Sequence, residues 1–164
     1  FNFGDAQFLG STGNIALASP IVGMASTPDG KGYWLVAADG GIFPFGDAGG
    51  YGSTGAVRLN QPIVGMAATR TGLGYWLVAR DGGIFPFGDA TGFGSTGGRS
   101  LTAPIVGMAR TRAGDGYWLT GADGRIVAFG AADPIGSLAG ATLNAPVIAV
   151  ASNLAAEAPP APGG

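Results

Sequence analysis

The sequence repeats itself every 42 residues, and this period limits the possible folds more than any other feature of the chain. The motif "PIVGMA" begins at Pro20, Pro62 and Pro104, and a diverged copy, "PVIAVA", begins at Pro146. The motifs "FGDA", "GYWL" and "GSTG" return with the same spacing. We predict one repeat domain over 1–154, with whole units at 20–61, 62–103 and 104–145 and a partial fourth unit made from 1–19 and 146–154.

Each unit predicts β-strands, because β-branched and aromatic residues form runs of four to six between Gly, Pro, Asp and Thr. In the first whole unit the expected strands are "IVGMA", "YWLVA", "IFPF" and a short, weaker one near "YGST". Asp39-Gly40 lies between the second and third strands, and Asp-Gly supplies the positive φ of a two-residue type I′ turn. Pro44 removes a ladder donor, so the third strand should lie at an edge or carry a bulge.

The second strand is apolar on both of its faces. Alternation in "YWLVA" places Tyr33, Leu35 and Ala37 on one face and Trp34 and Val36 on the other. Both faces must therefore be covered by other sheets, as in a β-propeller, whose blades come from repeats of about 40 to 50 residues. The sequence predicts an all-β, propeller-like array of four-stranded repeats with about four blades, the last of them incomplete.

Two other repeat folds compete with the propeller. A β-trefoil also uses three units of this length, but three units account for only about 126 residues and the pattern continues into a fourth copy. A β-solenoid, in which units stack without closing a ring, remains an alternative. Residues 155–164 have the Pro/Ala/Gly composition of a tail or linker.

Two resemblances follow from these motifs. The string "VGMASTPDGKGYWLVAADGGIFPFGDA" is similar in pattern to the blades of WD-repeat and YVTN-type propellers. The longer pattern "PIVGMA...GYWLVA.DGGIF.FGDA..YGSTG", over about residues 1–151, resembles a repeat of secreted and cell-surface proteins of actinobacteria, often attached to hydrolase or cell-wall domains. This resemblance implies export and a propeller-like fold, and it brings no assigned activity or binding residues.

The residue inventory argues against catalysis. The chain has no His and no Cys, which removes the ordinary general base, the imidazole and thiolate metal ligands, and the Ser-His and Cys-His pairs. Paired carboxylates, as in glycosidases, remain conceivable. Most aspartates, however, recur with the 42-residue period, which is typical of architecture rather than of one active site. We therefore predict no enzymatic activity, no cofactor and no metal site.

Charge and hydropathy limit the partners. The net charge is -2, and the eight basic residues are scattered, so nucleic acid is not an expected ligand. No apolar run reaches the roughly 18 residues that span a bilayer, so the chain is not expected to cross a membrane. Only 11% of the residues are charged, against about 25% in typical domains, and such a neutral surface favours association. The fourth unit lacks a "GYWL" strand, which leaves an edge open for homo-oligomer formation.

Six residues are candidates for ligand binding: Asp5, Asp47, Asp89, Tyr51, Phe93 and Arg80. The aspartates belong to "FGDA", where a carboxylate can cap a turn, and a ring of them could instead bind calcium or sugar hydroxyls. The two aromatic residues lie in glycine-rich turns and are expected to be exposed. Arg80 replaces an alanine of the other units.

Three further arginines, Arg70, Arg110 and Arg112, cluster in corresponding loops of the units and also break the symmetry of the repeat. A ligand site needs such individuality, although a solvated loop charge is the alternative. Together these features predict a secreted or cell-surface, non-catalytic binding or scaffold module that contacts cell-wall polysaccharide or a surface protein. The alternative is a structural subunit that assembles into oligomers or fibres by completing strands between chains.

Overall fold

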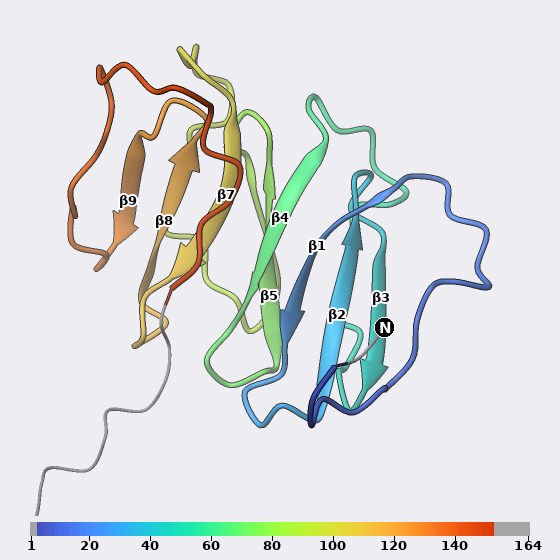
Figure 1. Cartoon of the computed structure of the whole chain (residues 1–164). Coiled ribbons are helices and arrows are strands. Elements are labelled where there is room, and N and C mark those ends of the chain that lie inside the picture. The colour runs from blue at the N-terminus through green and yellow to red at the C-terminus, as the bar shows by residue number, and fades with distance from the viewer. Residues whose placement is uncertain (1–2, 153–164) are drawn as a thin grey trace, which may run out of the picture.

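The computed structural model describes residues 3–152, and within them the chain is all-β, as predicted, with no helix. The strands are β1 (Ile21–Ser26), β2 (Gly32–Ala37), β3 (Ile42–Gly46), β4 (Ile63–Ala68), β5 (Gly74–Ala79), β6 (Ile84–Gly88), β7 (Ile105–Arg110), β8 (Gly116–Gly121) and β9 (Ile126–Gly130). They form three antiparallel sheets, ordered β1-β2-β3, β4-β5-β6 and β7-β8-β9 (Figure 1). The predicted tail at 155–164 lies outside the described residues.

Each sheet has three strands, so the expectation of a fourth strand near "YGST" is wrong. The backbone of this segment forms hydrogen bonds, but not to a neighbouring strand. The N–H of Tyr51 donates to the hydroxyl of Tyr75 at 3.2 Å, and the N–H of Thr54 donates to the carbonyl of Gly40 at 3.2 Å. The segment therefore ties one sheet to the next instead of widening its own.

The second and third strands of each sheet form a hairpin, but its turn is not the predicted type I′. A type I′ turn needs a positive φ at both central residues. Gly40 has a φ of 80°, but the φ of Asp39 is not positive. The N–H of Gly40 donates to the carbonyl of Ala37, and the N–H of Ala37 donates to the carbonyl of Gly41. This is the pattern of a type I turn followed by a left-handed glycine. The carboxylate of Asp39 accepts the N–H of Gly41 at 2.9 Å and stabilises the turn.

The third strand lies at the sheet edge, as its proline predicts. Pro44 is opposite Trp34 in the register of β2 and β3, and β3 has no further neighbour in its sheet. An edge strand needs ladder donors on one side only, so the missing N–H costs little there. The same placement returns for Pro86 in β6.

The sheets stack face to face with their first strands innermost, which is a propeller-like arrangement. Figure 1 shows β1, β4 and β7 side by side, with the other strands of each sheet farther out. Glycines allow the close approach: a Cβ at Gly23 would lie 3.4 Å from the Cα of Gly65, and one at Gly65 would lie 3.7 Å from the Cα of Gly107.

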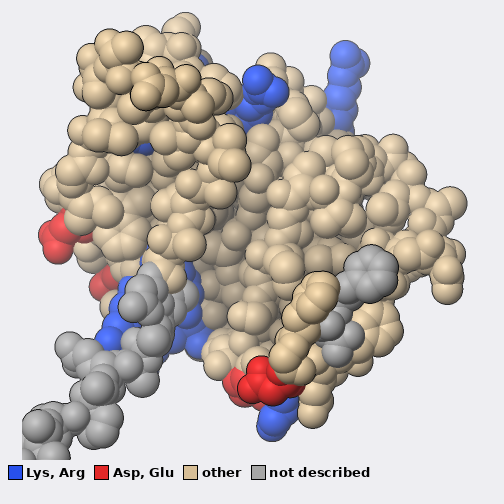
Figure 2. All heavy atoms as spheres, viewed as in Figure 1, with Lys and Arg blue, Asp and Glu red and all other residues tan. Residues whose placement is uncertain are grey.

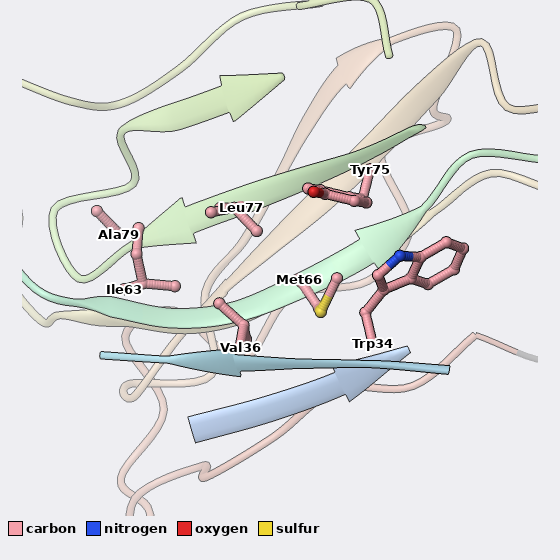
Figure 3. Close-up of a cluster of buried hydrophobic side chains, with 7 residues drawn as sticks. All are labelled: Trp34, Val36, Ile63, Met66, Tyr75, Leu77 and Ala79. Carbon is pink, nitrogen blue, oxygen red and sulfur yellow. The ribbon is translucent and has the colours of Figure 1, made fainter. Parts of the chain in front are cut away.

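The core lies between the sheets, as the two apolar faces of "YWLVA" require. One core cluster joins side chains of β2 to side chains of β4 and β5 (Figure 3), namely Trp34, Val36, Ile63, Met66, Tyr75, Leu77 and Ala79. A second cluster repeats this contact between the middle and last sheets. All six residues of β5 are buried, because the middle sheet is covered on both sides.

The partial unit at the C-terminal side keeps the contacts of a whole unit. The N–H of Val147 donates to the carbonyl of Ala122 at 3.0 Å, as the N–H of Ile63 donates to the carbonyl of Ala38 at 2.8 Å. Residues 146–151 thus continue as an inner segment beside β7, but within the described residues no second strand pairs with them.

The partial unit at the N-terminal side behaves in the same way. The hydroxyl of Tyr33 donates to the carbonyl of Gly10, as that of Tyr75 donates to the carbonyl of Gly52.

No helix in the described part of the chain has both the length and the apolar character needed to cross a membrane.

Candidate functional site

Tyr51 is part of an interface between sheets, so the expected exposure of this residue is wrong. Its ring lies 6.5 Å from that of Trp34 and 5.9 Å from that of Tyr75, measured between centroids, and its hydroxyl donates to the carbonyl of Gly72 at 3.1 Å. Such tilted aromatic contacts stabilise beyond the area they bury. Tyr51 therefore holds adjacent sheets together and is only partly exposed.

Phe93 repeats this role one unit later and is also only partly exposed, against expectation. Its ring centroid lies 6.3 Å from that of Trp76 and 5.6 Å from that of Tyr117. The glycine-rich turn places the aromatic ring in the interface because its backbone binds a tyrosine of the next sheet: the N–H of Phe93 donates to the hydroxyl of Tyr117.

The "FGDA" aspartates are exposed and stay in their separate units. Asp89 accepts a hydrogen bond from the hydroxyl of Thr71, and the N–H of Asp47 donates to the carbonyl of Lys31. Both residues thus join the end of the third strand to the loop before the second. Within residues 3–152 no group of three or more His, Cys, Asp or Glu side chains could hold a metal ion, so Asp5, Asp47 and Asp89 do not converge on one.

Arg80 is exposed at the opposite end of the inner strands from the other three symmetry-breaking arginines. It borders a mostly apolar cavity of about 380 Å³, to which the inner strands contribute Val22, Val64 and Val106. Its backbone links two sheets, because its carbonyl accepts the N–H of Ile105 at 2.9 Å.

A larger cavity, of about 850 Å³, lies where the inner strands end; we call it the inner-strand cavity. Its lining comes from all three sheets and from the last described residues: Met24, Ala25, Ser26, Thr27, Pro28, Met66, Ala67, Ala68, Thr69, Arg70, Met108, Ala109, Arg110, Arg112, Ala151 and Ser152. The methionines and alanines give it an apolar floor. Its volume is in the range of ligand sites, which are about 300 to 1,000 Å³.

The loops around the inner-strand cavity are built in the same way in each unit. A buried threonine begins each loop, and the hydroxyl of Thr27 donates to the carbonyl of Gly32 at 3.1 Å. Neighbouring loops touch through glycine: a Cβ at Gly72 would lie 2.7 Å from Cδ of Pro28, and one at Gly114 would lie 3.3 Å from Cβ of Arg70. This contact fixes the loop of the last sheet against the base of the Arg70 side chain.

Three arginines give the cavity its charge, and we call them the arginine cluster: Arg70, Arg110 and Arg112. The guanidinium group of Arg110 is anchored to its own loop, because Nη1 donates to the carbonyls of Thr111 at 3.0 Å and Arg112 at 3.2 Å. Burial lowers the pKa of Arg110, and the neighbouring charge of Arg70 lowers it further. Figure 2 shows basic side chains gathered at the end of the molecule where β7 finishes.

No carboxylate among the described residues lines this cavity. The acidic residues of the same loops have partners of their own away from the lining of this cavity. Asp115 accepts the hydroxyl of Thr111 at 2.8 Å, and Asp29 lies 3.5 Å from Nζ of Lys31. The N–H of Lys31 and the hydroxyl of Thr27 hold the pKa of Asp29 below its ordinary value, so this carboxylate is charged and already bonded.

The arrangement favours non-covalent binding over chemistry. The polar side chains of the cavity carry hydroxyl and guanidinium groups. A guanidinium group stays protonated near neutral pH and so cannot act as a general base. An arginine fork can bind a carboxylate or a phosphate through two parallel hydrogen bonds. The site can therefore hold an anionic group above an apolar floor.

Comparison with known proteins gives a likeness in fold alone. No family model matches the chain, and no curated protein matches its sequence. Among solved structures, the β-propeller domain of Cps50 (Swd1) from Myceliophteria thermophila is similar, with 11% identity and a TM-score of 0.46 over 68% of this chain. The matched part is 38% of that chain's length, and a likeness at this level assigns no activity or partner.

From the sequence alone, the three arginines of the cluster could be recognised only as residues that break the symmetry of the repeat. The period of 42 places Arg70 and Arg112 at equivalent positions, which shows that both belong to the same kind of loop. It does not show that the loops of neighbouring sheets touch, because that depends on how the sheets stack. The aligned inner strands bring the two positions to one cavity.

Proposed function

We propose that this chain is a non-catalytic binding and scaffold module of the cell surface, and that its ligand is a cell-wall polysaccharide or a surface protein. The inner-strand cavity carries the proposal. It is the place where loops of all three sheets meet and where the units differ, with proline at position 28 and arginine at positions 70 and 112. The resemblance to actinobacterial surface repeats supports the location.

Sedimentation with purified, insoluble cell walls tests this function. The variant Ser26→Trp places a large ring in the cavity, because Ser26 lines it and is exposed. The matched control is Ser100→Trp, at an exposed serine that does not line the cavity. We expect the wild-type chain and the control to sediment with the walls and the cavity variant to stay in solution. Equal sedimentation of both variants, or none by the wild type, would refute the proposal.

A structural subunit is the second candidate, and the outer side of the last sheet favours it. There a cavity of about 320 Å³ has an apolar lining that includes Trp118, Ile126 and Ile135. Arg110 and Arg112 border this cavity as well as the inner-strand cavity. At the two other interfaces a tyrosine of the next sheet contacts the equivalent tryptophan, with 5.7 Å between the rings of Trp34 and Tyr75. Here no tyrosine of the described chain does so.

The oligomeric state tests this second candidate. We expect a subunit that completes its sheets between chains to show a mass above 16.1 kDa that rises with concentration. The variant Ile148→Glu should abolish the rise, because Ile148 is 84% exposed on the unpaired inner segment. A constant monomer mass over the whole concentration range would eliminate the structural-subunit candidate.

A further inference from the structure

We infer that the arginine cluster makes the inner-strand cavity selective for an anionic polysaccharide, one that carries phosphate or carboxylate groups. This rests on the proposed function, and it adds the chemical class of the ligand. Two adjacent sheets supply the cations, with Arg70 from the loop after β4, and Arg110 and Arg112 from the end of β7 and its loop.

One member of the arginine cluster, Arg110, is held in place before any ligand binds. The two carbonyls that accept from Nη1 of Arg110 fix one guanidinium, and the other nitrogens of that group remain available as donors. The base of the Arg70 side chain lies next to Gly114 of the neighbouring loop, since a Cβ at Gly114 would be 3.3 Å from Cβ of Arg70. A preorganised donor set loses less entropy on binding than a mobile one.

The charges of the cluster are not balanced within the described structure. No ion pair joins these three arginines to a carboxylate of residues 3–152, whereas Lys31 and Arg125 each have an acidic partner at 3.5 Å. Arg110 is partly buried, and a cation that has lost part of its hydration is stabilised by a counter-charge. An anion placed between the guanidinium groups would supply that charge and relieve their mutual repulsion.

The rest of the cavity favours a saccharide as the carrier of the anion. The floor of methionine and alanine side chains offers apolar contact to the carbon face of a sugar ring or a polyol, and Ser26 adds an exposed hydroxyl. Nucleic acid fits less well, because binding to it generally rests on many phosphate contacts and this cluster has three cations. The aromatic rings near the interfaces are also engaged in packing and are not free for base stacking.

The test is titration of the full chain with four polymers: polygalacturonate, a glycerol phosphate polymer, dextran and single-stranded DNA. Removal of one cation is expected to weaken binding of either anionic polysaccharide by about tenfold or more, since the loss of one hydrogen bond to a charged group changes affinity by roughly ten- to a hundredfold. The variants are Arg70→Gln, Arg110→Gln and Arg112→Gln. Arg58→Gln, at an exposed arginine that lines none of the cavities described above, should stay within about twofold.

The polymers separate the possible outcomes. Tighter binding of polygalacturonate identifies carboxylate as the preferred group, and tighter binding of the glycerol phosphate polymer identifies phosphate; both support the inference. Equal binding of dextran, tighter binding of DNA, or unchanged affinity in the three cluster variants would overturn it. Raising the salt concentration should weaken specific binding, because the cluster is partly exposed and screened by ions.

The result also separates this inference from the proposed function. Cell-wall sedimentation that is lost in Ser26→Trp but kept in the arginine variants would preserve the proposed function and refute the anionic ligand. Binding of anionic polymers through the arginines without binding to cell walls would do the reverse. Arg70→Gln and Arg112→Gln change exposed side chains, so they keep the test valid if Arg110→Gln fails to fold.

Discussion

The tyrosine of "GYWL" offers a sharp test of how the sheets are held together, because one chain contains it at three positions in different surroundings. The hydroxyl of Tyr75 donates to the carbonyl of Gly52 at 2.6 Å and accepts the N–H of Tyr51 at 3.2 Å. Tyr75 is fully buried. Tyr75→Phe keeps the ring contacts and leaves one donor and one acceptor without a partner, so we expect a loss of about 2 to 3 kcal/mol of stability.

The same change at Tyr33 is the matched control. Within residues 3–152 the hydroxyl of Tyr33 forms a hydrogen bond only to the carbonyl of Gly10, and Tyr33 is partly exposed, so water can replace the lost bond. We expect Tyr33→Phe to cost about 1 kcal/mol or less. Tyr117→Phe should resemble Tyr75→Phe, because the hydroxyl of Tyr117 also bonds to the backbone of the preceding sheet.

Urea unfolding followed by circular dichroism measures the three losses. Because neighbouring units of a repeat protein can unfold separately, the slopes of the transitions must agree before the free energies are compared. Equal losses at positions 33 and 75, or a loss below about 0.5 kcal/mol at position 75, would refute the role given to these hydroxyls.

Two further predictions follow from the same interfaces. Burial raises the pKa of Tyr75 and of Tyr117, so the stability that these neutral phenols contribute should be lost as the pH rises above about 10, the ordinary tyrosine value. When the free energy of unfolding is measured at increasing alkaline pH, the Phe variants should therefore lose less stability than the wild type. Gly52→Ala should destabilise strongly, because its Cβ would lie 2.5 Å from Cδ1 of Phe87 at a φ of 129°, whereas Gly50→Ala meets nothing within 4 Å; thermal unfolding of the pair checks this difference.

The strand content and the stacking of the sheets could be predicted because they depend on local patterns. Two apolar faces in "YWLVA" require cover on both sides, and β5 is buried along its whole length. Pro44 requires a position without a ladder donor, and β3 is an edge strand. In both cases the reason lies within one strand, so the sequence contains it.

The predictions were wrong where a segment bonds to a residue that is distant along the chain. The pair Asp39-Gly40 fits a type I′ turn as well as the observed turn, and in the observed turn the carbonyl of Gly40 accepts the N–H of Thr54. Tyr51 stands in a glycine-rich stretch that reads as an exposed loop, yet its backbone bonds to Tyr75 of the next sheet. These partners are 14 and 24 residues away along the chain, and the local pattern of a strand or turn does not reveal them.

The repeat itself separates the residues that build the fold from those that can select a ligand. Every unit keeps a buried threonine, at positions 27, 69 and 111, whose hydroxyl bonds within its own loop: to the carbonyl of Gly32, to the carbonyl of Gly74 and to the carboxylate of Asp115. The position one residue later changes from Pro28 to Arg70 and Arg112, and nothing in the loop geometry requires arginine there, since the unit with proline forms the same loop. Arg70 and Arg112 are exposed at that position and form no ion pair with a carboxylate of residues 3–152, so both guanidinium groups can donate to an anionic ligand in the inner-strand cavity.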